Sequence, residues 1–403
     1  MIYTCRLALH VAVVAIGFLH SFDALAAEPL PETRVALERL SKFAAGQKPA
    51  ERKLVFVYFT PSDRDPPDGF RQRLTRVMTD IQKFYAGEME RHGFGRRTIR
   101  FDRDDHGQAV FHVVKGKKPA TDYLEDHGAH TGDAIRRESR PVLTAAGIDD
   151  NKETVVYFCH LRTEKDGRVT GIGPYYGGGS FRNGRAWFTD ATILDAARLA
   201  DKTTMLSDQQ YGHISVGRYN SIFIGGATHE LGHALGLPHD KERTDERARG
   251  TSLMGSGNRT YGEERRGEGH GSFLTLADAL RLASHPMFSG CDRDFDARPE
   301  CRIDDLKAEA RGKRLELSGR VIATPGPYAI IAYNDPEGGS DYDATTWTAP
   351  LDKSDRFHLS IAQFKPGKAE LRLVVCHLNG ATSTKHYPIT ADKAGVPDAK
   401  GIK

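Results

Sequence analysis

The sequence predicts a mixed α/β (α+β) domain over residues 50–300, built on a mixed twisted sheet, and an all-β sandwich of immunoglobulin-like type over residues 301–390. Before residue 190, apolar runs of strand length alternate with amphipathic helical stretches, which is the order of an α/β sheet. From about residue 301, short alternating runs are divided by polar turns, which is typical of a sandwich. Residues 27–49 are expected to form a separate helical segment, and residues 391–403 a flexible tail.

The first 26 residues predict an export signal. One early positive charge, Arg6, precedes an apolar run over residues 7–19, and Ala24-Leu25-Ala26 offers small residues for cleavage after Ala26. The run is too short to span a membrane. No later stretch approaches about twenty apolar residues, so we expect a secreted or periplasmic protein without a membrane span.

Composition and cysteine content further narrow the class of protein that the sequence indicates. With 39% hydrophobic and 28% charged residues the chain is globular, and a formal net charge of +3 is too small to indicate a nucleic-acid partner. Four cysteines follow the expected cleavage site: Cys159, Cys291, Cys301 and Cys376. Cys291 and Cys301 bracket a short polar loop, so we expect them to form a disulfide after export. Cys159 and Cys376 lie inside apolar runs, where a disulfide and buried free thiols explain the pattern equally well.

Periodicity places the elements of the α/β domain. Residues 53–60 form a continuous apolar run that predicts a strand buried on both faces. Residues 68–91 carry apolar side chains at three- and four-residue steps, which predicts a long amphipathic helix. The same reasoning predicts strands at residues 97–101, 109–114 and 154–160, and helices at residues 31–46, 131–146 and 274–283. Asn220 or Ser221 could cap one more helix, which ends in the motif described next.

That helix carries the candidate catalytic and metal-binding residues. From His229 the sequence reads His-Glu-Leu-Gly-His-Ala-Leu-Gly-Leu-Pro-His-Asp. His229 and His233 lie one helical turn apart, so both imidazoles share a face and could bind one Zn²⁺. Gly236 can reverse the chain and bring His239 back as a third ligand. Glu230 could take a proton from a water that the metal activates. Three protein ligands with a free fourth position are typical of a catalytic zinc site.

A second motif, Ser-Leu-Met-Gly-Ser-Gly around Met254, follows the first. Together the two motifs resemble the metzincin clan of zinc endopeptidases, in which a tight turn places a methionine below the metal. Asp240 is most similar to the adamalysin (reprolysin) branch. The resemblance implies an active-site helix, a packing role for Met254, and an Asp240 that orients the loop of His239 through nearby backbone groups. Some branches place an extra tyrosine ligand two residues after the methionine. Ser256 stands there in this chain, and Tyr261 lies too far along to replace it.

The glycine-rich stretch at residues 171–177 and the apolar run at residues 184–190 resemble the last two strands of adamalysin-like domains. In those domains the first strand lies antiparallel at the sheet edge, along the cleft, where an extended substrate could pair with it. This resemblance makes four residues candidates for substrate binding: Gly173, Tyr175, Tyr176 and Gly177. The glycines at residues 177–179 would let the substrate backbone approach closely. A plain glycine-rich hairpin explains the same residues equally well.

These features predict an exported zinc-dependent endopeptidase with Zn²⁺ as cofactor, Glu230 as general base, and a protein or peptide as substrate. The C-terminal sandwich could bind a protein or surface ligand that the sequence does not identify. Two alternatives stay open: an inactive metzincin-like binding or adhesion protein, and a zinc hydrolase of a non-peptide amide. The intact Glu230 argues against the first, since a protein that only binds has no need of this carboxylate.

Overall fold

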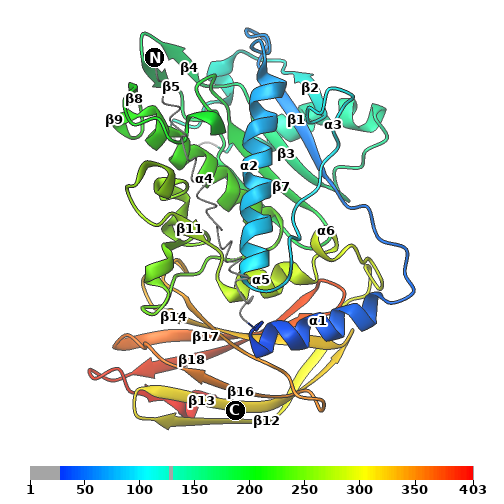
Figure 1. Cartoon of the computed structure of the whole chain (residues 1–403), viewed down its shortest axis with the longest axis vertical. Helices are drawn as coiled ribbons and strands as arrows, with labels where there is room; N and C mark the ends of the chain where they lie inside the picture. The colour runs from blue at the N-terminus through cyan, green and yellow to red at the C-terminus, as the bar shows by residue number, and fades with distance from the viewer. Residues whose placement is uncertain (1–27, 127–129, 403) are drawn as a thin grey trace, which may run out of the picture.

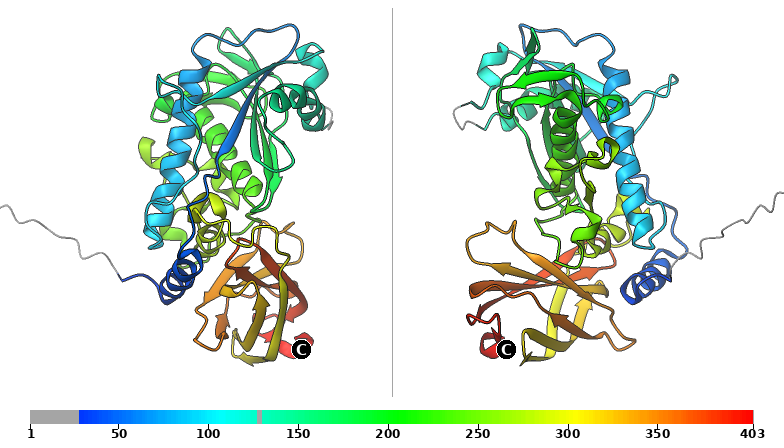
Figure 2. Two further views of the ribbon diagram at one scale, coloured as in Figure 1. Left: turned by 90° about the vertical axis from the view of Figure 1, so that its right-hand side faces the viewer. Right: turned by 60° about the vertical axis from the view of Figure 1, so that its left-hand side comes forward.

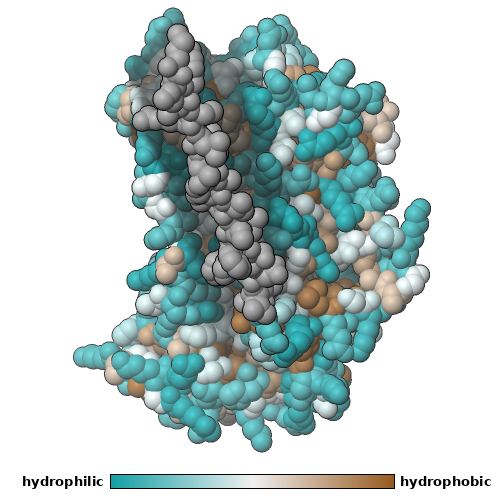
Figure 3. Space-filling model, in the orientation of Figure 1, coloured by the Kyte–Doolittle hydropathy of each residue, from teal (hydrophilic) through white to brown (hydrophobic). Residues whose placement is uncertain are grey.

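The computed structural model describes residues 28–126 and 130–402, so the predicted signal segment lies outside the described part of the chain. An α/β region comes first and a β-rich region follows it (Figure 1). In the same orientation, hydrophilic side chains dominate the surface, and apolar ones occur in small scattered patches (Figure 3). Within the described ranges, no helix has the length and apolar character that a membrane crossing requires.

A five-stranded mixed sheet forms the centre of the α/β region. Its strands, in spatial order, are β2 (Phe111–Lys115), β1 (Leu54–Thr60), β3 (Thr154–Cys159), β7 (Gly184–Thr189) and β6 (Tyr176–Gly179). The first four are parallel, and β6 runs antiparallel to β7 at the edge. This edge strand shares only Tyr176 and Gly177 with the glycine-rich stretch 171–177 that was expected to form it. The prediction of a strand at residues 97–101 is wrong, because no strand forms there. The Ile99 carbonyl accepts a bond from the Gln82 side chain at 2.8 Å, and only Phe101 makes an isolated bridge.

Alternate side chains of β1 show how the helices cover this sheet. Phe56 and Tyr58 share a buried cluster with α2 (Phe70–Arg91) and α4 (Val216–Ala234). Val57 and Phe59 share another with α3 (Gly132–Ala145). Successive strand residues point to opposite faces, so α2 and α4 lie on one face and α3 on the other (Figure 1). Cover on both faces explains why this strand is apolar throughout.

A smaller four-stranded sheet was not predicted. Its order is β4 (Thr163–Lys165), β5 (Arg168–Thr170), β8 (Met205–Asp208) and β9 (Gly212–Ser215). These strands are only 3 or 4 residues long and largely exposed, so they leave no clear alternation in the sequence. A buried ion pair at 2.9 Å joins Arg162 to Asp208 of β8. Arg162 also donates to the Tyr219 hydroxyl of α4 at 3.1 Å, which holds this sheet beside the N-terminal half of the helix.

The N-terminus of α4 differs from the prediction. Ser215 at the end of β9 is the N-cap, and its hydroxyl accepts a hydrogen bond from the Arg218 backbone N–H at 3.1 Å. Asn220 and Ser221, the predicted caps, lie inside the helix and are fully buried. The helix begins earlier because the extended backbone of β9 already presents a serine at the position that a cap requires.

The β-rich region consists of two antiparallel sheets around a common core. One contains β12 (Glu300–Arg311), β13 (Arg314–Thr324) and β16 (Arg356–Ile361). The other contains β15 (Thr345–Ala349), β14 (Pro327–Pro336), β17 (Gly367–His377), β18 (Thr382–Ala391) and β19 (Pro397–Asp398). The predicted tail after residue 390 is wrong, because β19 pairs with β18 and Ile402 is buried against the same core.

The two regions share one hydrophobic core. Tyr328 and Ile331 of β14 and Val374 of β17 belong to the same buried cluster as α2 and α4. The N-terminal helix α1 (Pro31–Ala44) also lies against the β-rich region, as the two rotated views show (Figure 2). Its Arg39 donates to Asp355 at 2.5 Å. The β-rich region is therefore packed firmly against the rest of the chain.

The predicted Cys291–Cys301 disulfide is wrong, because the four cysteines within the described residues are free thiols. The Cys291 thiol follows the short helix α6 (Pro286–Ser289) and donates to the Gln47 side chain at 2.8 Å. Cys301 lies on β12 and packs against the core of the β-rich region. The two residues are close in sequence, but their side chains pack in different parts of the structure.

Candidate metal centre

The C-terminal half of α4 and the turn after it build the site. His229 and His233 lie one turn apart on the helix, as predicted. The helix then ends at a left-handed Gly236 with φ +87°. The N–H of Gly236 bonds to the His233 carbonyl at 2.9 Å, and the N–H of Leu237 bonds to the Gly232 carbonyl at 2.9 Å. This pair of bonds is a Schellman motif, which reverses the chain and returns it toward the helix.

The reversal brings three imidazoles together. The Nε2 atom of His233 lies 3.0 Å from Nε2 of His229 and 3.0 Å from Nε2 of His239. All three ligand atoms lie within 4.8 Å of one another. Separations of this size are expected of nitrogens that share one ion at about 2.0–2.1 Å.

Each ring is held by its other nitrogen. Nδ1 of His229 lies 2.7 Å from the carbonyl oxygen of Leu253, and Nδ1 of His233 lies 2.8 Å from that of Leu237. An Nδ1–H that donates to an oxygen leaves the Nε2 lone pair free for a metal. Burial lowers the pKa of His229 to about 3 and also lowers the pKa of His233, which favours the neutral form of the ring that a metal requires. The three histidines could therefore hold a metal ion.

Glu230 lies on the same helical turn and borders a hollow of about 180 Å³, which we call the Glu230 hollow. Burial raises the pKa of Glu230 to about 7, and a hydrogen bond from the Gly177 backbone N–H opposes part of that rise. The lining of the hollow includes the polar side chains of Arg162, Thr189, Gln210, Tyr211 and Asn258. A desolvated carboxylate is a stronger base than an exposed one, so Glu230 can accept a proton beside the three imidazoles.

Met254 packs against α4, and Asp240 directly follows the third histidine. Met254 is fully buried, and a Cβ added to Gly232 of α4 would lie 2.6 Å from its sulfur. Asp240 is also fully buried, and burial raises its pKa. Its carboxylate accepts hydrogen bonds from the Ser252 hydroxyl and, at 2.6 Å, from the Thr275 hydroxyl. The side-chain partners of Asp240 are therefore hydroxyls, and the predicted bonds to backbone groups are wrong. Thr275 caps α5 (Leu276–Ala283), so Asp240 joins the methionine turn to that helix.

The four predicted substrate-binding residues divide into two groups. Gly173 and Tyr175 line the Glu230 hollow, and Gly177 contacts Glu230. Tyr176 does not reach the hollow. Its hydroxyl accepts a hydrogen bond from the Gly132 N–H of α3 at 2.8 Å, so its side chain lies on the opposite face of the sheet.

The glycines of β6 do allow another backbone to approach closely, but that backbone is helix α4 and not a substrate. A Cβ on Gly177 would lie 2.0 Å from the carbonyl oxygen of Glu230, and one on Gly179 would lie 2.2 Å from that of Ala234. A Cβ on Gly178 would meet nothing within 4 Å. The prediction that these glycines make room for a substrate backbone is therefore wrong for Gly177 and Gly179, which let α4 pack directly against the sheet edge.

Two residues of the site were missed by sequence reasoning. Oδ1 of Asp341 lies 2.7 Å from Nδ1 of His239 and holds the third imidazole. The ring of Tyr342 stacks on His239 with 3.6 Å between centroids. Both lie in the loop between β14 and β15, and no sequence motif marks them. Tyr261, the tyrosine that the sequence did bring into consideration, is buried and bonds to Asp80 at 2.7 Å.

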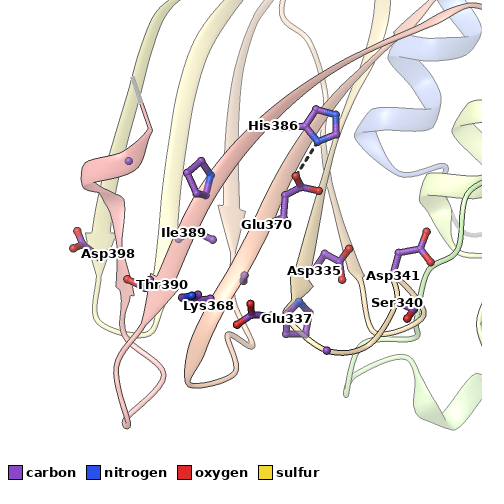
Figure 4. Close-up of a pocket in the computed structure, with 15 residues that line it drawn as sticks. Asp335, Glu337, Ser340, Asp341, Lys368, Glu370, His386, Ile389, Thr390 and Asp398 are labelled. Carbon is purple, nitrogen blue, oxygen red and sulfur yellow. Dashed lines mark hydrogen bonds and ion pairs between the residues drawn. The ribbon is translucent and has the colours of Figure 1, made fainter.

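The loop that carries Asp341 also borders a larger hollow of about 670 Å³ on the β-rich region (Figure 4). Its acidic lining residues are Asp335, Glu337, Asp341, Glu370 and Asp398. The basic side chains in the lining are those of Lys368 and His386, and Nδ1 of His386 lies 3.0 Å from Glu370. The surface that continues from the third histidine is therefore predominantly acidic.

Comparison with known proteins gives a structural likeness. No family model and no curated protein matches the chain. A crystal structure of catalytically inactive OgpA from Akkermansia muciniphila, in complex with an O-glycopeptide (glycodrosocin) substrate, matches with a TM-score of 0.71 and 26% identity. The match covers 86% of this chain and 94% of OgpA. Two structures of wild-type OgpA match with a TM-score of 0.70 each and 26% and 25% identity. The likeness supports a metallopeptidase-like fold and does not single out the adamalysin branch.

Proposed function

We propose that this chain is an exported zinc-dependent endopeptidase that cleaves O-glycosylated peptides. The observation that carries the proposal is the convergence of three Nε2 atoms beside a buried carboxylate, in a chain whose structural neighbour was solved with an O-glycopeptide substrate. The finer assignments rest on the two motifs. We infer a metzincin-like catalytic domain over residues 50–300, closest to the adamalysin branch in the residue after the third histidine, and an immunoglobulin-like domain that runs from residue 301 to residue 402 and includes β19.

His229, His233 and His239 would hold the zinc ion, since three imidazoles suit it and leave a fourth position open. When bound, zinc would supply Lewis acidity that polarises a carbonyl and lowers the pKa of water. Glu230 would take the proton of the attacking water and then transfer it to the nitrogen of the leaving amine, so that the carboxylate is regenerated. Its burial, which raises its pKa to about 7, makes it a better base than an exposed glutamate.

The substrate would bind in extended form along β6. Within the described ranges this strand pairs only with β7, so its other edge could add a strand. The Glu230 hollow would then take the side chain next to the scissile bond. Because its lining offers hydroxyl, amide and guanidinium groups, it suits a side chain that carries hydroxyl groups, as a glycosylated serine or threonine does.

A pair of matched peptides tests the proposal. The mature protein is incubated with a synthetic O-glycopeptide and with the same peptide lacking the sugar, each with and without a zinc chelator, and the products are identified by mass spectrometry. We expect cleavage of the glycopeptide next to the glycosylated residue, little cleavage of the bare peptide, and none after chelation. Equal cleavage of both would remove the glycan preference, and no cleavage of any peptide by zinc-loaded protein would contradict the function.

A further inference from the structure

The loop between β14 and β15 leaves the β-rich region and reaches the metal centre. It spans residues 337–344, and the segment directly after the third histidine fixes it in place. The Lys241 N–H donates to the Ala344 carbonyl at 2.7 Å, and Lys241 forms a parallel bridge with Thr345 of β15. The Lys241 ammonium donates to Asp343 at 2.8 Å, and Lys365 donates to the other oxygen of the same carboxylate at 2.6 Å. The loop is therefore anchored to both regions.

Within this loop, the Asp341 carboxylate lies between an imidazole of the metal centre and a guanidinium of the β-rich region. One oxygen lies 2.7 Å from Nδ1 of His239, and the other lies 4.0 Å from the guanidinium of Arg372 on β17. Arg372 also lies 3.3 Å from Asp335 on the neighbouring strand β14, so it is held within the sheet. The β-rich region thus fixes the position of the carboxylate, and the carboxylate fixes the tautomer and orientation of the third imidazole.

Tyr342, the next residue, covers the same imidazole from one side. Its ring lies 3.6 Å from His239, centroid to centroid, and 6.4 Å from His229, with an angle of 4° between the planes of the Tyr342 and His229 rings. The side chain is nevertheless 45% exposed, which is unusual for a large aromatic residue in a packed junction. One ring face therefore rests on the metal centre while the rest of the ring faces the open space beside it.

We propose that this loop is a working part of the active site: Asp341 is a positioning residue for the third metal ligand, and Tyr342 is a wall of the cleft that contacts the substrate. The inference deepens the proposed function and rests on it for the role of Tyr342. The role of Asp341 requires only that the three histidines bind a metal. The β-rich region then completes the catalytic centre and is more than an attached module.

The role of Asp341 is tested by metal binding alone. Asp341→Ala and Asp341→Asn are compared with Glu337→Ala, which removes an exposed carboxylate from the same loop without touching His239. Zinc affinity is measured by competition with a chelator, and the visible spectrum of the Co²⁺-substituted protein reports the ligand geometry. Loss of such an orienting partner typically weakens metal affinity 10–100-fold. We expect that loss and an altered cobalt spectrum for Asp341→Ala, a smaller loss for Asp341→Asn, which keeps an acceptor oxygen, and wild-type behaviour for Glu337→Ala. Wild-type affinity and spectrum in Asp341→Ala would overturn this role.

The role of Tyr342 is tested by substrate binding. In a Glu230→Gln background, which should bind without cleaving, Tyr342→Ala should weaken binding of the O-glycopeptide about 10-fold, the scale of one well-packed aromatic contact. Tyr342→Phe should retain most of the affinity because it keeps the ring face. Zinc affinity should stay within about 2-fold of the parent in both, since all three imidazoles and the Asp341 carboxylate stay in place. Unchanged peptide affinity, or equal losses of peptide and zinc affinity, would overturn the substrate contact.

The two tests also separate this inference from the proposed function. If the protein binds and cleaves no peptide, the proposed function fails and the role of Tyr342 fails with it. The metal affinity of Asp341→Ala would still decide whether the β-rich region positions the third ligand. If peptides are cleaved and both sets of variants behave as wild type, the function stands and the inference about the loop is wrong.

Discussion

Gly177→Ala should separate the edge strand from the active-site helix. The new Cβ would lie 2.0 Å from the carbonyl oxygen of Glu230, whereas ordinary contact begins at 3.4 Å, so β6 and α4 would have to move apart by about 1.4 Å. Gly177 has no positive φ, so alanine fits its backbone and the effect is steric. Overpacking of this kind typically costs about 1–3 kcal/mol. A displacement of about 1 Å near reacting groups can also lower the rate about 10²-fold.

Gly178→Ala is the matched control, because it lies on the same strand and its Cβ would meet nothing within 4 Å. Urea denaturation of the metal-free proteins gives the free energy of unfolding, and glycopeptide cleavage gives kcat/KM. We expect Gly177→Ala to be destabilised by about 1–3 kcal/mol, with a large loss of kcat/KM, and Gly178→Ala to unfold within about 0.5 kcal/mol of wild type. If both variants unfold at the same urea concentration, the proposed close contact between β6 and α4 is wrong.

Three further predictions concern other parts of the molecule. Burial lowers the pKa of His285 to about 3, and its Nδ1 accepts the Met287 N–H at 3.2 Å. Between about pH 6.5 and 3 the unfolded state protonates this imidazole and the folded state does not, so the free energy of unfolding decreases as the pH is lowered. Metal-free wild type should therefore lose ~2 kcal/mol more than His285→Asn between pH 7 and 5. Equal losses in urea titrations would contradict this. Cys291 and Cys301 should both be alkylated in unfolded, unreduced protein, and a disulfide-linked peptide in mass mapping would count against the free thiols. His239→Ala should lose zinc affinity and activity together, with partial recovery in excess zinc, and full zinc content at wild-type affinity would exclude it as a ligand.

The local part of the site could be predicted from sequence because each feature is encoded within a few residues. Helical spacing places His229 and His233 on one face, and Gly236 supplies the left-handed residue that returns His239. The apolar run at residues 53–60 likewise reveals a strand covered on both faces, because burial on both sides leaves no polar position. These inferences needed no knowledge of distant contacts.

The parts that escaped prediction depend on long-range packing. Asp341 is 102 residues from His239 in the sequence, and nothing near Asp341 indicates that its loop meets the metal centre. The glycines of β6 could be recognised as sites of close approach, but the sequence does not show that the approaching backbone is α4. Cys291 and Cys301 look like a pair when only their spacing is considered, yet each packs against a different part of the structure.

The most direct test of the central claim compares zinc content and glycopeptide cleavage in wild type and Glu230→Gln. Glutamine keeps the size of the side chain and cannot take a proton at neutral pH, while the three imidazoles are untouched. We predict about one zinc per chain in both proteins, and cleavage at least 10²-fold slower in the variant, the scale of a lost general base. Wild-type cleavage by zinc-loaded Glu230→Gln would contradict the account, and so would a wild-type protein that cleaves at full rate without any metal.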